Sequence, residues 1–405
     1  MASAHSMAQT RALPLDSLAT TGRPQEIVLL GASLSHLEFL AQLRTKPLPQ
    51  ARVTLVHPDA SLIAHDRLVD ALQDDAALAG CQIALEPLAL DCGVRWRQGR
   101  VLQLNLSAQT VTLTDGTVLR FDWLSLSPRC WDNREYLDQR IPGALNHCLF
   151  THPAERFMAL WPRVVDLHTR RTLRITVLGG ATQGAELAYA IKRRLPQAAL
   201  TWLTLDAAAA ASAADAAALV QALQGADITV LHEQALAIAQ GSVQLACGAT
   251  LACDVPIIAE TLDAPDWIRS SGLLPSAPSA PSAPSAPSAP PQGDAAPQPP
   301  QVDAWSRCVG HPQVFMAPHT GTALGRNLAA SVLGASLLAS PGAPAKGVHW
   351  FWRRQGLALQ WAPLPLRGPL GNWAKSVHDK GLRARYQTAP LTAPSAPQEQ
   401  SGRQA

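Results

Sequence analysis

Two segments of the chain repeat one order of apolar and polar positions. Residues 27–38 read IVLLGASLSHLE and residues 175–186 read ITVLGGATQGAE. Each begins with a short strand-like run, passes through a glycine and a turn of small residues, and ends in a helix-compatible stretch with glutamate at the same offset. The pattern predicts a strand, a glycine turn and a helix at both places.

The repeat continues after each predicted helix. LPQARVTLVHPD begins at Leu48 and LPQAALTWLTLD begins at Leu195, so a helix exit and a β-rich run recur in the same order. Residues 100–127 and 242–260 then alternate apolar and polar positions, which is typical of a β-meander. We therefore predict two β-α-β units with parallel strands and right-handed crossovers, each followed by a small antiparallel meander and a return strand.

These elements predict an α/β protein with two Rossmann-like, three-layer dinucleotide-binding domains, β-meander insertions and a small α/β C-terminal region. Residues 276–290 are five Ser-Ala-Pro triplets, which cannot form a core and predict an extended linker. The expected organisation is a disordered N-terminus at 1–24, a first domain at 25–160 and 302–345, a second domain at 161–275, a linker at 276–301, a C-terminal region at 346–390 and a disordered tail at 391–405.

Composition narrows the class of protein. The 405 residues are 47% hydrophobic and carry a net charge of +3 without any basic block, so nucleic acid is not an expected partner. No apolar run is long enough to span a bilayer, and the N-terminal residues contain no signal-peptide core, so a cytoplasmic location is the default expectation. The seven cysteines are scattered without a Cys-x-x-Cys, and we expect no metal site.

The glycine turns suit the pyrophosphate of a dinucleotide. The first glycine of such a turn permits the tight connection, the second lets the backbone approach the phosphates, and the third lets the helix pack close to the strand. The start of the helix supplies amide donors and a favourable dipole. The second copy nearly fulfils this pattern with Gly179, Gly180, Ala181 and Gly184, which are its candidate nucleotide contacts.

The first copy departs from the pattern. Its turn consists of Gly31, Ala32 and Ser33, and His36 stands where the third glycine belongs. A side chain at that position is expected to push the helix away from the strand.

The acidic residue that normally binds the ribose hydroxyls at the end of the second strand is also missing. His57 and Thr204 occupy the two strand ends, and Asp59 and Asp206 follow two residues later. Each aspartate is a candidate substitute for ribose binding, with an ordinary solvated turn residue as the alternative. The second strand is followed neither by its usual acid nor by an arginine for a 2′-phosphate, so NADH and NADPH both stay open.

Five further segments carry a family resemblance: VTLVHPDASLIAH, GVRWRQGRVLQLNLSAQTVTLTDGTVLRFDWLSLS, IPGALNHCLFTHPAERFMALW, HPQVFMAPHTGTALGRNLAASVL and GNWAKSVHDKGLRARY. With the two units, they resemble the pyridine nucleotide-disulphide oxidoreductases. Within that fold they are most similar to the type II NADH dehydrogenase-like flavoproteins, particularly the flavoprotein module fused to selenide, water dikinase. The resemblance implies FAD on the first unit, NAD(P)H on the second, and a small electron acceptor such as a quinone.

Several positions depart from that family. Pro318 and His319 stand after VFMA where the family has a Gly-Asp pair, and Ser127 begins the segment that replaces its Ala-Thr-Gly. These residues and His57 are the candidate flavin contacts that the resemblance implies. Proline removes a backbone donor, and histidine cannot accept from hydroxyls as a carboxylate does. We therefore expect flavin to be held weakly, in a changed pose, or not at all.

Two residues are candidates for a role near the reacting atoms. By the resemblance, Glu186 lies near the nicotinamide–flavin junction and His319 faces the flavin. A solvated or capping glutamate, and a histidine that drifted after loss of the cofactor, are the competing interpretations. Hydride transfer itself is cofactor chemistry and needs little acid–base equipment from the protein.

Three functions remain in competition at this point. The leading hypothesis is an FAD-dependent NAD(P)H oxidoreductase, and the second is a flavin-free pseudo-oxidoreductase that acts as a nucleotide-sensing or interaction module. The third is a peripheral electron-transfer protein on the inner face of the membrane, suggested by the aromatic and basic residues of the tail. Packing of these aromatics on the flavin domain or in a homodimer contact is the alternative. The tail residues concerned are Trp350, Phe351, Trp352, Trp361, Trp373, Arg353, Arg354, Arg367 and Lys375.

Overall fold

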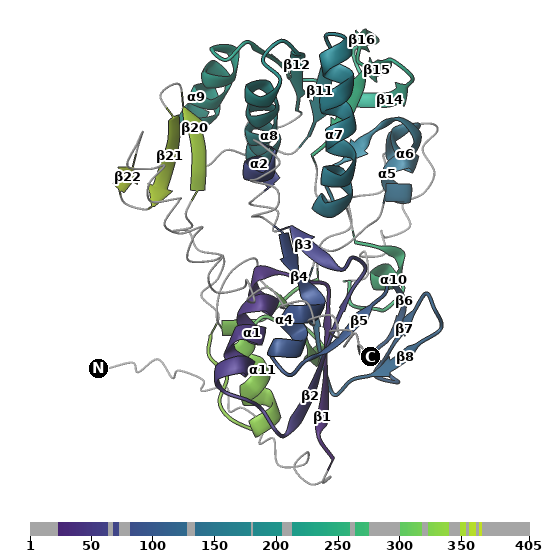
Figure 1. Cartoon of the computed structure of the whole chain (residues 1–405). Helices are drawn as coiled ribbons and strands as arrows, with labels where there is room; N and C mark the ends of the chain where they lie inside the picture. The colour runs from purple at the N-terminus through teal and green to yellow at the C-terminus, as the bar shows by residue number, and fades with distance from the viewer. Residues whose placement is uncertain are drawn as a thin grey trace, which may run out of the picture.

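The computed structural model contains two α/β domains, one above the other in Figure 1. In each, a mostly parallel sheet lies between a layer of helices and a small antiparallel meander. The described residues are 23–63, 68–72, 82–127, 134–179, 181–204, 213–259, 264–274, 300–317, 323–339, 349–353, 356–361 and 364–366. The expected linker and both expected disordered ends lie almost wholly outside these ranges.

The first domain is built on a sheet with the strand order β18-β19-β9-β1-β2-β5. All neighbours are parallel except β18 and β19. Helices α1, α4 and α11 cover one face, and the first meander with α10 covers the other. The elements are β1 (Gln25–Leu30), α1 (Leu34–Thr45), β2 (Ala51–His57), α4 (Leu85–Asp91), β5 (Arg95–Gln98), β9 (Trp123–Leu126), α10 (Asp266–Arg269), β18 (Arg307–Cys308), β19 (His311–Met316) and α11 (Ala323–Leu333).

The second domain repeats this arrangement with the parallel strand order β10-β17-β11-β12-β13. Its β1 and β2 equivalents, β11 and β12, pair directly, as the sequence repeat predicts. The elements are α5 (Arg134–Arg140), α6 (Ala144–His147), β10 (Leu149–Phe150), α7 (Ala154–Arg170), β11 (Arg174–Leu178), α8 (Ala181–Arg194), β12 (Ala199–Leu203), α9 (Ala213–Gln224), β13 (Ile228–Leu231) and β17 (Val255–Ile258).

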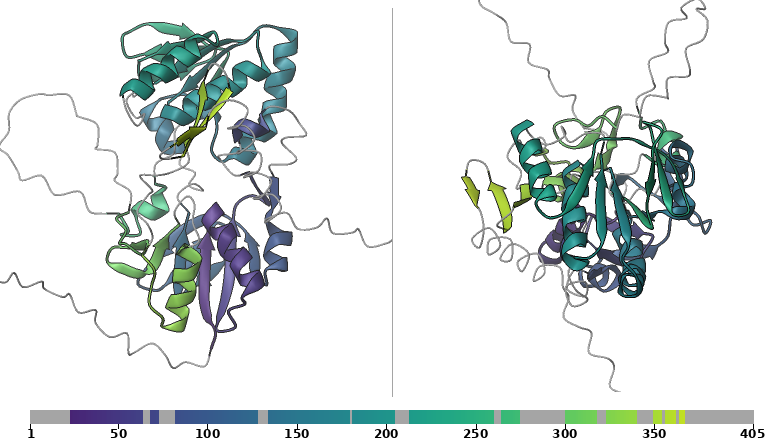
Figure 2. Two further views of the ribbon diagram at one scale, coloured as in Figure 1. Left: turned by 90° about the vertical axis from the view of Figure 1, so that its left-hand side faces the viewer. Right: turned by 90° about the horizontal axis from the view of Figure 1, so that it is seen from above.

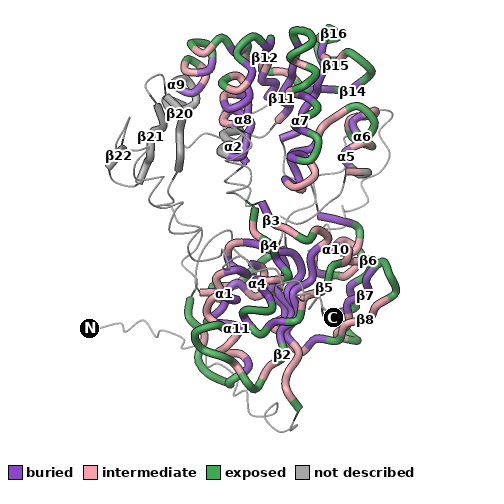
Figure 3. The backbone as a smooth tube through the Cα atoms, viewed as in Figure 1, coloured by how far each residue is buried: buried purple, intermediate pink, exposed green. Residues whose placement is uncertain are grey.

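Successive side chains of a strand point to opposite faces of the sheet. Because both faces of each sheet are covered, neighbouring residues of the central strands are buried in different layers. In β1, Ile27 and Leu29 pack among the helices, whereas Val28 and Leu30 pack under the meander. The central strands are accordingly the most buried parts of the backbone in Figure 3.

Both predicted meanders are confirmed as three-stranded antiparallel sheets. The turn at Asp115 and Gly116 closes the second hairpin of the first meander, and Gly116 has the positive φ of 82° that favours glycine. The strands are β6 (Val101–Asn105), β7 (Thr110–Leu113) and β8 (Val118–Arg120) in the first, and β14 (Ala235–Ala239), β15 (Ser242–Leu245) and β16 (Thr250–Ala252) in the second.

The described part of the C-terminal region is a further antiparallel sheet of β20 (His349–Arg353), β21 (Gly356–Trp361) and β22 (Leu364–Leu366). Figures 1 and 2 place β20 beside α8 and α9 of the second domain. The helical part of the expected α/β region lies outside the described residues.

The expected domain boundary between residues 160 and 161 falls inside α7. Strand β10, which comes before α7, already pairs with β17 of the second sheet. Phe157 and Trp161 stack on each other in the second domain's core. The second domain therefore begins before α7, and it includes α5 and α6 because Leu137 and Ala144 pack with Phe150 and Leu178.

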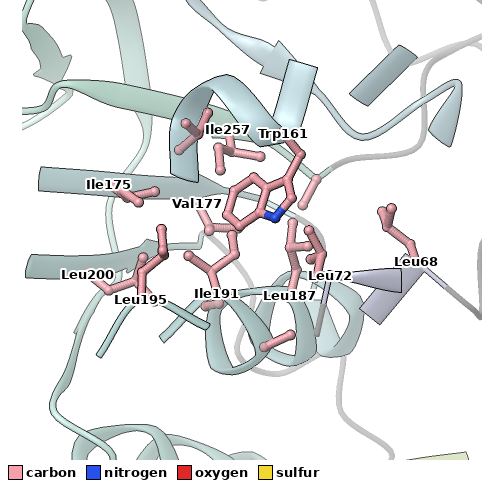
Figure 4. Packing of buried hydrophobic residues seen from close by; sticks show 14 of the residues in the cluster. Leu68, Leu72, Trp161, Ile175, Val177, Leu187, Ile191, Leu195, Leu200 and Ile257 are labelled. Carbon is pink, nitrogen blue, oxygen red and sulfur yellow. The ribbon is translucent and has the colours of Figure 1, made fainter. Parts of the chain in front are cut away.

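A segment of the first domain's crossover also enters that core. Strand β3 (Ser61–Ile63) pairs with β4 (Gln82–Ala84), and α2 (Leu68–Ala71) lies against α8. Leu68 and Leu72 pack with Trp161 and Leu187 in Figure 4. The two domains therefore share one hydrophobic cluster.

Candidate functional site

Two glycine turns occupy equivalent places at the carboxyl ends of the central strands. Gly31 donates its N–H to Val56 O, and Gly179 donates its N–H to Leu203 O, each over 2.8 Å. Both glycines have positive φ, 80° and 71°. We define residues 31–33 as the first turn and residues 179–181 as the second turn. The crevice outside such strand ends is where open α/β sheets bind ligands.

In the second unit, helix α8 approaches its turn very closely. A Cβ added at Gly184 would lie 2.1 Å from Gly179 O, so only glycine fits there. Trp202, on the neighbouring strand β12, donates its Nε1–H to the same carbonyl over 3.2 Å. Ala181 is the first residue of α8, so the turn leads directly into the helix start that suits a phosphate. Gly180 and Asp206 lie outside the described residues.

In the first unit, His36 occupies the position equivalent to Gly184. Its Nδ1 lies 2.5 Å from Gly31 O, and its Nε2 lies 2.8 Å from Ser125 Oγ on strand β9. Nδ1 therefore carries the proton and donates it to the carbonyl, and Nε2 accepts from the hydroxyl. Ser33 is the N-cap of α1, and its Oγ accepts from the backbone N–H of His36 over 3.3 Å.

A second histidine contacts the first turn from the end of β2. His57 Nδ1 accepts the backbone N–H of Ala32 over 3.1 Å. Its Nε2 therefore carries the proton, is buried, and has no hydrogen-bond partner within the described part of the chain. The first turn is thus bonded to two imidazole rings.

Both rings are neutral at pH 7. Burial lowers the pKa of His36 to about 4, against the opposing effect of the hydrogen bond to Gly31. Burial also lowers the pKa of His57 to about 4, and the proximity of His36 adds to this effect. Ala32 and Ser33 are buried together with both histidines.

The structure brings most of the described candidates together in two groups, one in each unit. Gly31, Ala32, Ser33 and His57 meet at one edge of the first sheet, and Ser127 follows β9 at the same edge and donates its N–H to Leu30 O over 2.9 Å. Gly179, Ala181 and Gly184 form the equivalent place in the second unit. Glu186 is half-buried in the second turn of α8. Pro318 and His319 lie outside the described residues.

Sequence reasoning missed a cluster of three side chains beside the first turn. One ligand atom each from His57, Asp59 and Glu155 lies within 4.8 Å of the others. Glu155 accepts the backbone N–H of Ile63, and burial raises the pKa of its carboxyl to about 7. Since the proton of neutral His57 is on Nε2, the ring is a donor toward carboxylates rather than a ready metal ligand. No sequence signal links these residues, because Glu155 comes from α7, far along the chain.

Two more residues were missed. Ser125 holds His36, and Trp202 takes the role toward Gly179 O that His36 takes toward Gly31 O. By strand register the equivalent of Trp202 is Leu55, since Trp202 pairs with Val177 and Leu55 pairs with Leu29. A comparison of the two copies at these positions was the available signal.

Comparison with known proteins identifies the fold. No family model and no curated protein matches the sequence. Sulfide:quinone oxidoreductase from the hyperthermophilic bacterium Aquifex aeolicus is similar in structure, with a TM-score of 0.66, 13% identity, and 89% of this chain and 92% of that chain covered. NDH2 from Plasmodium falciparum, solved with NADH, gives a TM-score of 0.65 and 11% identity over 90% and 96% of the two chains.

A water-forming NADH oxidase from Lactobacillus brevis, also solved with NADH, has a TM-score of 0.58 and 16% identity, and the match covers 83% of this chain and 75% of that chain. The chain therefore has the FAD/NAD(P) fold of the pyridine nucleotide-disulphide oxidoreductases, and the predicted fold class is confirmed. These neighbours are oxidoreductases, but identities this low establish the fold alone. Among the described residues, no helix is both long and apolar enough to cross a membrane.

Proposed function

We propose that the chain is an NAD(P)H oxidoreductase that holds its nicotinamide nucleotide on the second unit and FAD on the first, and passes electrons to a quinone or another small acceptor. The observation that carries the proposal is the pair of equivalent glycine turns, each at the carboxyl edge of a parallel sheet. Solved neighbours with NADH bound, and one named for a quinone, support the same assignment.

The second unit fits a nicotinamide dinucleotide. Gly179 makes the sharp turn, and Gly184 lets α8 approach it, so the backbone amides at the helix start converge on one small region. Glu186, in the second turn of α8, is proposed to orient the nicotinamide end. Asp206 is proposed to accept from a ribose hydroxyl.

The first unit fits FAD in its strand, turn and helix, and departs from the fit at His36. Gly31 turns the backbone as the fold requires, but a buried imidazole stands between the turn and β9. When bound, FAD supplies the hydride acceptor. The chain's part is to place it with the first turn, Ser127, Pro318 and His319. We expect this placement to be weak.

The test begins with protein purified without added flavin. A visible flavin spectrum, or its appearance on reconstitution with FAD, supports the flavin half of the proposal. Titration with NADH and NADPH measures nucleotide binding by the second unit separately. Energy transfer from tryptophan to the nicotinamide is the signal that monitors it. Absence of nucleotide binding in that titration would refute the proposal.

A flavin-free nucleotide-sensing module is the second candidate. It is favoured by one observation, the internal bonding of the first turn to His36 and His57. Such a protein would bind NAD(P)H, contain no flavin after reconstitution with FAD, and reduce no quinone. A membrane-surface acceptor is tested by co-sedimentation with liposomes, and no lipid association would count against it.

A further inference from the structure

The carbonyl oxygen of the first glycine of the turn accepts a side-chain hydrogen bond in both units, but the donor differs. In the second unit, Gly179 O accepts from the indole of Trp202 while glycine at position 184 leaves room for the helix. In the first unit, Gly31 O accepts from the imidazole of His36, and Leu55 stands where the tryptophan would be. The pair of glycine and tryptophan has thus been exchanged for histidine and leucine.

This exchange puts a side chain between helix and turn, where the second unit has direct contact between them. At Gly184 even a Cβ would lie 2.1 Å from the turn carbonyl, so the close contact of helix and turn is incompatible with any side chain. His36 places a whole ring at the equivalent position, fully buried and bonded to both Gly31 O and Ser125 Oγ. Close approach of helix and turn is what aims the backbone amides at a pyrophosphate.

A turn amide is also directed inward. The N–H of Ala32 donates to His57 Nδ1, and Ala32 is only 2% exposed. The first turn is therefore held by three side-chain hydrogen bonds, from Ser33, His36 and His57. Rearranging it for a diphosphate would break these buried hydrogen bonds and leave buried polar groups unsatisfied, which is unfavourable.

We propose that His36 abolishes the diphosphate subsite of the first unit, so that this unit does not distinguish FAD from riboflavin. Whatever affinity it has for flavin comes from the rest of the flavin molecule. Flavin is then an exchangeable ligand rather than a resident group. This inference rests on the proposed function in that it assigns flavin to the first unit.

The experiment compares FAD with riboflavin on the full chain. The two share the isoalloxazine ring, and only FAD carries the diphosphate and adenosine. Equilibrium dialysis gives both dissociation constants for four proteins: wild type, His36→Gly, the double variant His36→Gly with Leu55→Trp, and Ala41→Gly. The double variant rebuilds the arrangement of the second unit and supplies a new donor to Gly31 O. Ala41→Gly adds a glycine to the same helix without opening the turn.

We expect wild type and Ala41→Gly to bind the two flavins within about threefold of each other, or to bind neither. The double variant should favour FAD by at least about tenfold, and His36→Gly should do the same if it folds. The proposal is overturned if wild type already favours FAD about tenfold, or if the double variant, with its circular dichroism and NADH binding intact, gains nothing for FAD.

These outcomes are separable from failure of the proposed function. Tight FAD binding by wild type overturns this inference and leaves the oxidoreductase proposal standing. Loss of NADH binding by the second unit refutes the proposed function, whatever the flavin ratio shows.

Discussion

At the residue scale, the chain keeps two uncharged histidines beside the first turn. Both His36 and His57 have a pKa lowered to about 4 by burial, whereas each would titrate at the usual 6.5 in the unfolded chain. The unfolded state therefore binds more protons than the native state between these values. Stability is unaffected above about pH 6.5 and falls as the pH drops toward 4.

This predicts a pH-dependent difference between wild type and His57→Gln. Glutamine cannot ionise, and its side-chain oxygen can still accept the N–H of Ala32. On lowering the pH from 7 to 5, wild type should lose about 2 kcal/mol more free energy of unfolding than the variant. Urea unfolding at both pH values measures the difference. Equal losses in the two proteins would contradict a neutral, buried His57.

At the element scale, the contact between a helix and the preceding turn decides what each unit can bind. Helix α8 meets its turn through glycine, whereas α1 meets its turn through histidine. The N-terminus of α7 makes a different kind of contact, with a strand, since Glu155 accepts the N–H of Ile63 from β3. The contacts at α8 and α1 are local in the sequence, whereas the contact between Glu155 and Ile63 joins elements that are adjacent only in the folded chain.

Gly184→Ala is expected to weaken NAD(P)H binding by at least about tenfold, because its Cβ would lie 2.1 Å from Gly179 O and must push α8 away from the turn. Titration of the variant with NADH checks this. Gly225→Ala, at the exposed end of α9, has its nearest neighbour at 3.3 Å and serves as the control. Unchanged NADH affinity in Gly184→Ala would show that close helix approach is not required.

The contribution of Glu155 to the free energy of unfolding is expected to depend on pH in the opposite sense to that of the histidines. Its pKa is raised to about 7, so the native state binds more protons than the unfolded state above the usual 4.5. Its contribution to stability is complete below pH 4.5 and is lost as the pH rises through 7. Between pH 5 and 8, wild type should lose about 2 kcal/mol more than Glu155→Gln, measured by urea unfolding. A larger loss of free energy of unfolding in Glu155→Gln than in wild type would contradict a raised pKa of Glu155.

At the scale of the whole molecule, the two domains are joined by a shared core rather than by chain connections alone. Leu68 and Leu72 belong to the crossover of the first domain, yet they pack with Trp161 and Leu187 of the second. Unfolding of either domain exposes this cluster, so we expect the two to unfold together.

Leu72→Ala should therefore destabilise the second domain although it is a change in the first. Leu72 is 1% exposed, and removing a buried leucine side chain costs about 2–5 kcal/mol. Leu102→Ala, at a site 60% exposed on β6, should change stability by less than about 0.5 kcal/mol. Thermal unfolding followed by tryptophan fluorescence compares them. An unshifted transition in Leu72→Ala would refute the shared core.

The sequence by itself determined the repeated units, the meanders and the place of both turns. These rest on local signals: apolar runs such as residues 27–30, the glycines of the turns, and alternation along residues 100–127. Local backbone preference and side-chain period need no knowledge of distant residues. Alignment of the two copies also identifies His36 as the replacement of a glycine.

Only the tertiary structure decided what that histidine does. Ser125, which holds His36 Nε2, comes from a strand far along the chain, and Glu155 reaches His57 and Asp59 from a helix of the second domain. The entry of α2 into the second core depends likewise on how the domains pack. Such contacts follow from which strands become neighbours and which surfaces are buried together, and no local pattern encodes these.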